Sequence, residues 1–101
     1  MFPDRTKMQV DHIKGIVHLG LRVTDNHVQN IVMPIREMFK ICTPSTKKYE
    51  WTVGTIYWQF YRKTEHIKLF FKTEHVDFHW RFSHEEWDDI TKELLEKVKE
   101  G

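Results

Sequence analysis

The chain has 101 residues, of which 40% are hydrophobic and 31% are charged, and its formal net charge at pH 7 is +1. These values are typical of one globular domain with a modest core, and they exclude a disordered tail. The single cysteine, Cys42, excludes an internal disulfide and a zinc site built from several cysteines. Aromatic residues reach 14% and alanine is absent, a bias that favours a fast-evolving accessory protein of viral or plasmid origin.

The charge is distributed unevenly along the chain. Residues 1–82 contain 13 Lys+Arg and 8 Asp+Glu, whereas residues 83–101 contain 3 and 7. A basic body with an acidic end argues against a mimic of DNA and is compatible with a polyanionic partner. No apolar run reaches the length of a membrane span, and no signal-peptide pattern is present. We therefore expect a cytoplasmic protein without a membrane partner.

The first residues show two successive patterns. Residues 1–12 are mostly polar and are expected to form either a flexible arm or a short helical turn. From Ile13 to Val23 the apolar residues fall mainly on alternate positions, the pattern of a half-buried strand. A strand is therefore predicted over residues 14–23.

A helix is predicted to follow this strand. Thr24 or Asp25 would be its N-cap, and apolar residues then recur every three or four positions as far as Cys42. Pro34 lies inside this stretch, and it is expected to kink or divide the helix because proline removes a backbone hydrogen bond. A loop is expected at residues 43–48.

A near-repeat of nine residues occupies the centre of the chain. Lys-Thr-Glu-His occurs at residues 63–66 and again at 72–75, and we interpret each copy as a four-residue turn between antiparallel strands. The predicted pairing places Leu69 opposite Phe60 in the first hairpin and opposite Phe78 in the second. A slip of one residue would scatter the resulting apolar face, so we expect the register of both hairpins to be well specified.

The C-terminal residues predict a second helix. Ser83 is a good N-cap, and Glu86 three positions later completes a capping box. Phe82 before the cap and Trp87 after it would form a hydrophobic staple. The stripe expected to be buried consists of Trp87, Ile90, Leu94 and Val98.

The predicted order is strand, helix, three-stranded meander and helix, in one domain over residues 1–101. One apolar sheet face and two amphipathic helices favour an α+β two-layer sandwich, in which both helices pack on one face of an antiparallel sheet. The opposite face of the sheet would then be exposed.

That exposed face combines aromatic rings with basic side chains. Rings on a sheet surface can stack unpaired bases, while neighbouring Lys or Arg side chains neutralise phosphates. We therefore expect a small non-catalytic module that binds single-stranded RNA or DNA and needs no cofactor. The residues expected to contact the nucleic acid are Tyr57, Tyr61, Phe70, Lys63, Lys68, Lys72, His79 and Arg81.

Two other functions would use the same face. A protein partner or a second copy of the chain could cover the rings, which would make the chain a protein-interaction or inhibitor module. The third function is a metal-independent ribonuclease, with His75 or His79 as general acid or base and Lys68 or Arg81 stabilising phosphate charge. No sequence motif supports this third function.

No metal site is expected. His75, Asp77 and His79 alternate along one predicted strand, and alternate residues of a strand lie about 6.6 Å apart, which is wide for chelation. Cys42 is interpreted as a small buried apolar residue, because no His or acidic residue is placed beside it to make it a nucleophile.

Overall fold

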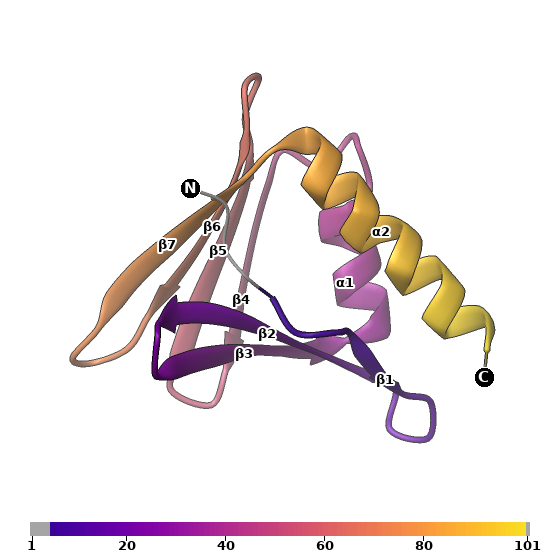
Figure 1. Cartoon of the computed structure of the whole chain (residues 1–101), viewed down its shortest axis with the longest axis horizontal. Coiled ribbons are helices and arrows are strands. Elements are labelled where there is room, and N and C mark those ends of the chain that lie inside the picture. Colours follow the sequence, from indigo (N-terminus) through magenta and orange to yellow (C-terminus); the bar gives the residue numbers. More distant parts are fainter. Residues whose placement is uncertain (1–4, 101) are drawn as a thin grey trace.

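A computed structural model describes residues 5–100 of the chain, which form two antiparallel sheets and two helices (Figure 1). The three-stranded sheet has the order β1 (Gln9–Asp11), β2 (Ile16–Thr24), β3 (His27–Pro34). The four-stranded sheet has the order β4 (Lys48–Val53), β5 (Ile56–Arg62), β6 (Ile67–Lys72), β7 (Asp77–Phe82). The helices are α1 (Ile35–Cys42) and α2 (His84–Lys99). The α+β class is confirmed, with two sheets where one was expected.

The strand expected over residues 14–23 is confirmed as β2, but the helix expected after it is wrong over its first half. The chain turns back at residues 25–26 and pairs with β2 as β3, and only Ile35–Cys42 is helical. Pro34 divides the segment as predicted. It ends β3, an edge strand where proline is tolerated, and it is also the N-cap residue of α1.

Apolar residues on both sides of β3 explain why its sequence resembles a helix. Ile31 and Met33 are at most 1% exposed and belong to the core, whereas Val28 is 44% exposed on the other side of the strand. Ile31 and Met33 alternate as in a strand, whereas Val28, Ile31 and Ile35 are three and four positions apart, as on one face of a helix. A short apolar stretch with both periods fits either element, and here the pairing with β2 decides.

The segment before β2 lies against that strand. Residues 1–4, part of the expected arm, lie outside the described residues. Over the described part of this segment, neither the flexible arm nor the helical turn is found. Met8 is 1% exposed, and Gln9–Asp11 forms the strand β1. The Thr6 N–H donates to the Gly20 carbonyl and the Gly20 N–H donates to the Thr6 hydroxyl, each at 2.8 Å. A Cβ at position 20 would lie 2.9 Å from that hydroxyl oxygen, so this approach requires glycine.

The meander is confirmed, with a change of register in its second hairpin. Leu69 pairs with Phe60 as predicted, but on its other side it pairs with Trp80 and not with Phe78. Both hairpins have four-residue loops, at residues 63–66 and 73–76. Because the register shift is two residues, every strand side chain stays on its predicted face.

Thr73 accounts for the shifted loop. Its hydroxyl accepts hydrogen bonds from the N–H groups of His75 at 3.3 Å and Val76 at 3.0 Å. Threonine at the first position of a turn favours such bonds. The second loop therefore begins at Thr73, and Lys72 becomes the last residue of β6.

The meander was expected to begin at about residue 49 and to have three strands, but the four-stranded sheet contains β4 as a further, separate strand. A two-residue loop, Gly54-Thr55, connects β4 to β5. Gly54 has φ +60°, while Thr55 has negative φ, which is the pattern of a type II′ hairpin turn. Glycine suits position 54 because it adopts a positive φ without steric cost.

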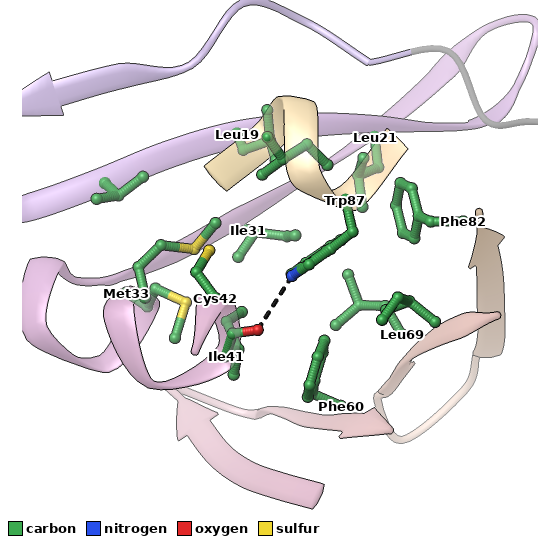
Figure 2. Close-up of a cluster of buried hydrophobic side chains, with 14 of the residues drawn as sticks. Leu19, Leu21, Ile31, Met33, Ile41, Cys42, Phe60, Leu69, Phe82 and Trp87 are labelled. Carbon is green, nitrogen blue, oxygen red and sulfur yellow. Dashed lines mark hydrogen bonds between the residues drawn. The ribbon is translucent and has the colours of Figure 1, made fainter. Parts of the chain in front are cut away.

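The core lies between one face of the four-stranded sheet, the three-stranded sheet and the helices (Figure 2). Trp87 of α2 is central to it, with the rings of Phe60 and Phe82 each 5.2 Å from its own ring. Its indole Nε1 donates a 3.0 Å hydrogen bond to the Ile41 carbonyl at the end of α1, drawn as the dashed line in Figure 2. One side chain therefore joins both helices to the sheet.

The start of α2 is as predicted. The Ser83 hydroxyl accepts a 3.0 Å hydrogen bond from the Glu86 N–H, and the Glu86 carboxylate accepts a 2.7 Å bond from the Ser83 N–H. The contact between Phe82 and Trp87 supplies the predicted staple. The stripe is also confirmed, because Trp87, Ile90 and Leu94 are buried and Val98 packs beside the core.

Arg62 ties the end of α1 to the four-stranded sheet. Its Nε donates to the Thr46 carbonyl at 3.1 Å, and its Nη2 donates to the carbonyls of Ile41 at 3.1 Å and Thr43 at 3.3 Å. We expect Arg62→Met to lower the free energy of unfolding by about 1.5–3 kcal/mol, the range for hydrogen bonds to charged groups. Urea denaturation measures this loss. Arg36→Met, at an exposed position of α1, should cost less than about 0.5 kcal/mol, and equal losses would contradict the role of Arg62.

Candidate functional site

The candidate site is the face of the four-stranded sheet that points away from the core, here called the outer face. Because successive side chains of a strand point to opposite sides, every second residue of β4–β7 belongs to it. Its three cross-strand rows are Thr52–Tyr57–Lys72–Asp77, Glu50–Gln59–Phe70–His79 and Lys48–Tyr61–Lys68–Arg81. Every one of these residues is exposed or half-buried.

Most of the predicted site residues meet on this face. The strands bring together Tyr57, Tyr61, Phe70, Lys68, Lys72, His79 and Arg81. Lys63 is the exception, since it lies in the loop 63–66, at the end of the sheet beside the third row. The placement predicted for His75 is wrong. The register shift moves His75 into the loop 73–76, where its Nε2 lies 3.9 Å from the Glu74 carboxylate.

The contribution of β4 was missed at the level of sequence. Lys48, Glu50 and Thr52 form one edge of the outer face, although residue 48 was expected in a loop. The sequence does contain the pattern of a strand here, since Tyr49, Trp51 and Val53 alternate with these polar residues. Alternation followed by Gly54-Thr55 is typical of a strand leading into a hairpin.

The third row is strongly basic. Lys68 pairs directly with Arg81 across β6 and β7, and like charges in that position destabilise a sheet. Lys48 Nζ lies 5.8 Å from the centroid of the Tyr61 ring, and Lys68 Nζ lies 5.0 Å from the centroid of the Phe70 ring. Cations and rings are therefore interleaved here, and a bound anion would relieve the repulsion between Lys68 and Arg81.

A fixed polar network lies at the β4 side of the face. The Gln59 amide nitrogen donates to the Tyr57 hydroxyl oxygen at 3.1 Å and to Glu50 Oε1 at 3.3 Å. Lys48 Nζ lies 3.4 Å from the same Glu50 oxygen. Hydrogen bonds from Tyr57 and Gln59 lower the pKa of Glu50, while burial and the Glu50 carboxylate raise the pKa of Tyr57. At neutral pH this network therefore holds a charged carboxylate beside a neutral phenol.

His79 is the cross-strand partner of Phe70 and adjoins the basic third row. Its ring centroid is 5.4 Å from that of Phe70. Desolvation, followed by the positive charges of Lys68 and Arg81, lowers the pKa of His79 from its usual 6.5. The imidazole is therefore mainly neutral at pH 7.

We expect an NMR titration of His79 to give a pKa below 6.5. Lys68→Met should raise it, because removal of a neighbouring positive charge favours the protonated ring. Lys92→Met, an exposed change on α2, should leave it unaltered. A wild-type pKa above 6.5, or no response to Lys68→Met, would contradict this account of the face.

A hollow opens between the first and second rows of the outer face. Its volume is about 270 Å³. The residues that line it are Tyr57, Gln59, Phe70, Phe71, Lys72 and Asp77.

Other sites give fewer indications of function. Within residues 5–100, no group of three His, Cys, Asp or Glu side chains could hold a metal ion. Cys42 is buried as predicted, and burial raises the pKa of its thiol. In the same part of the chain, no helix combines the length and apolar character needed to cross a membrane.

Comparisons with known proteins do not assign a family. No protein-family model matches the chain, and searches of curated proteins and of solved structures give no significant match. Function is therefore inferred from the outer face alone.

Proposed function

We propose that the chain is a small non-catalytic module that binds single-stranded nucleic acid, RNA or DNA, on its outer face. The observation that carries the proposal is the interleaving of three rings with a basic row on one open sheet surface. Tyr57, Phe70 and Tyr61 step diagonally across β5 and β6. Diagonal neighbours in a sheet lie about 7–8 Å apart, within reach of bases on an extended strand.

The rings and cations would have separate roles. Unpaired bases stack on aromatic side chains whatever their sequence, because every base has a flat face. Phosphates would be contacted by Lys68 and Arg81, with Lys63 at the adjoining end of the sheet. Single strands suit this surface better than duplexes, because paired bases are not free to stack on the rings.

The competing function, a protein or dimer interface on the same face, is less favoured by the charges. The three rows contain four cations and two carboxylates. Self-association would bring like charges together and remove them from water, which is costly unless each is paired. Catalysis has little geometric support, because His79 is the one histidine in these rows and His75 lies in a loop.

We also propose that the protein is an accessory protein of the cytoplasm. A chain with a single cysteine suits a reducing compartment.

The test is binding of fluorescently labelled single-stranded RNA and DNA to the full chain at low and moderate salt. Light scattering in parallel gives the mass of the protein. We expect a monomer to bind both strands, with affinity falling as salt rises because phosphate contacts release counterions. A duplex of the same sequence should bind more weakly. A dimer that binds no single strand would contradict the proposal and favour the interface.

A further inference from the structure

We infer that the hollow between the first two rows of the outer face is a pocket for one nucleobase and that it selects guanine. This inference rests on the proposed function and names the base that the same face would recognise. The volume of about 270 Å³ lies just below the roughly 300–1,000 Å³ of pockets for drug-sized ligands. A ligand smaller than these, such as a single base on a strand, suits that size.

The hollow is lined by both aromatic and polar side chains. Phe70 and Tyr57 supply ring surface on β6 and β5, where a planar base can stack. Gln59 lies between them, and both hydrogens of its amide nitrogen are engaged by Tyr57 and Glu50. The amide carbonyl of Gln59 makes no hydrogen bond within residues 5–100, so its oxygen is available to accept a hydrogen bond from a ligand.

Lys72 and Asp77 form the charged edge of the hollow. They are direct cross-strand partners at the end of β6 and the start of β7, and both are exposed. Neither side chain makes a hydrogen bond or ion pair with any other residue in the described range 5–100. A carboxylate and an ammonium group are thus available side by side at the rim of a ring-lined hollow.

Guanine is the base whose edge matches this pair. Its N1–H and N2 amino group are adjacent donors, which one carboxylate can accept together, and its O6 beside them is an acceptor for an ammonium group. Adenine and cytosine would place an unprotonated ring nitrogen against the Asp77 carboxylate. Uracil offers a single N–H between two carbonyl oxygens. In each of these three bases an acceptor atom would face the Asp77 carboxylate, and the resulting repulsion would favour guanine over them.

The test compares four labelled RNA pentamers, pentauridylate and the same strand with a central guanine, adenine or cytosine, by fluorescence anisotropy. The guanine pentamer should bind roughly 5- to 150-fold more tightly than pentauridylate, the range for one bidentate base contact. Asp77→Asn should abolish this preference. The same change removes a negative charge, so pentauridylate should bind as tightly as before or more tightly.

Glu74→Gln is the matched control, because it makes the same charge change in the adjoining exposed loop. It should preserve the preference for guanine. Equal binding of all four pentamers, or a guanine preference that survives Asp77→Asn, would overturn the pocket and leave the nucleic-acid proposal standing. Failure of every pentamer to bind would overturn both. An amide NMR spectrum of each variant that matches the wild type shows that the sheet is intact.

Discussion

Trp87→Ala is expected to lower the free energy of unfolding by about 3–5 kcal/mol, the usual cost of emptying a large aromatic site in a core. Trp87 is 1% exposed and packs between the rings of Phe60 and Phe82. Its loss also removes the indole donor to the Ile41 carbonyl. Small domains have total stabilities of about 5–15 kcal/mol, so the variant should be partly unfolded at moderate temperature.

Urea denaturation followed by circular dichroism measures this loss. Trp87→Phe keeps part of the packing, since it retains one aromatic ring, and loses the donor. Its cost should be smaller than that of Trp87→Ala, because the ring still fills part of the site and Arg62 still donates to the Ile41 carbonyl. Leu95→Ala, at a 43% exposed position of the same helix, is the control. If Trp87→Ala cost no more than this control, the central place of Trp87 in the core would be wrong.

Replacing Tyr61 and Phe70 together with alanine is expected to reduce binding of single-stranded RNA below detection. Stacking contributes roughly 1–3 kcal/mol per base in comparable systems, so each ring accounts for about a 5- to 150-fold change in affinity. Both side chains are half-buried and lie outside the core, so the fold should survive. Fluorescence anisotropy measures the binding, and circular dichroism verifies the fold.

Val28→Ala is the control for the double variant. It removes an apolar side chain, 44% exposed, from the other sheet. Its affinity should equal that of the wild type. Unchanged binding by the double variant would exclude the rings from the site. If the double variant instead dissociated a dimer of the wild type, the rings would be a protein interface.

The composition of the outer face was predictable from sequence, because it depends only on alternation. A register shift of an even number of residues leaves Phe70, Lys68 and His79 on the same side of the sheet. The cross-strand neighbours were less predictable. The expected register placed Asp77 opposite Phe70, whereas the structure places it opposite Lys72. The charged edge of the hollow therefore follows from the turn at Thr73, whose hydrogen bonds the repeated Lys-Thr-Glu-His motif did not reveal.

The two errors in secondary structure have different causes. Over residues 27–34 the apolar residues fit both a helix and a strand. The strand forms because it pairs with β2, and a local sequence pattern does not reveal such a tertiary contact. β4 was missed as a separate strand although its alternation was clear, because the hairpin turn at Gly54-Thr55 was not recognised. The C-terminal helix was predictable in detail, since Ser83 and Glu86 specify its start through contacts three residues apart.

An NMR titration of the isotopically labelled chain with a short single-stranded RNA tests the central claim most directly. We expect the largest shifts of backbone amide signals at Tyr61, Lys68, Phe70 and Arg81 on the outer face. The exposed positions of α2, such as Asp88 and Leu95, should not shift. Perturbations confined to α2 or to the three-stranded sheet, or none at all, would contradict the outer face as the site of nucleic-acid binding.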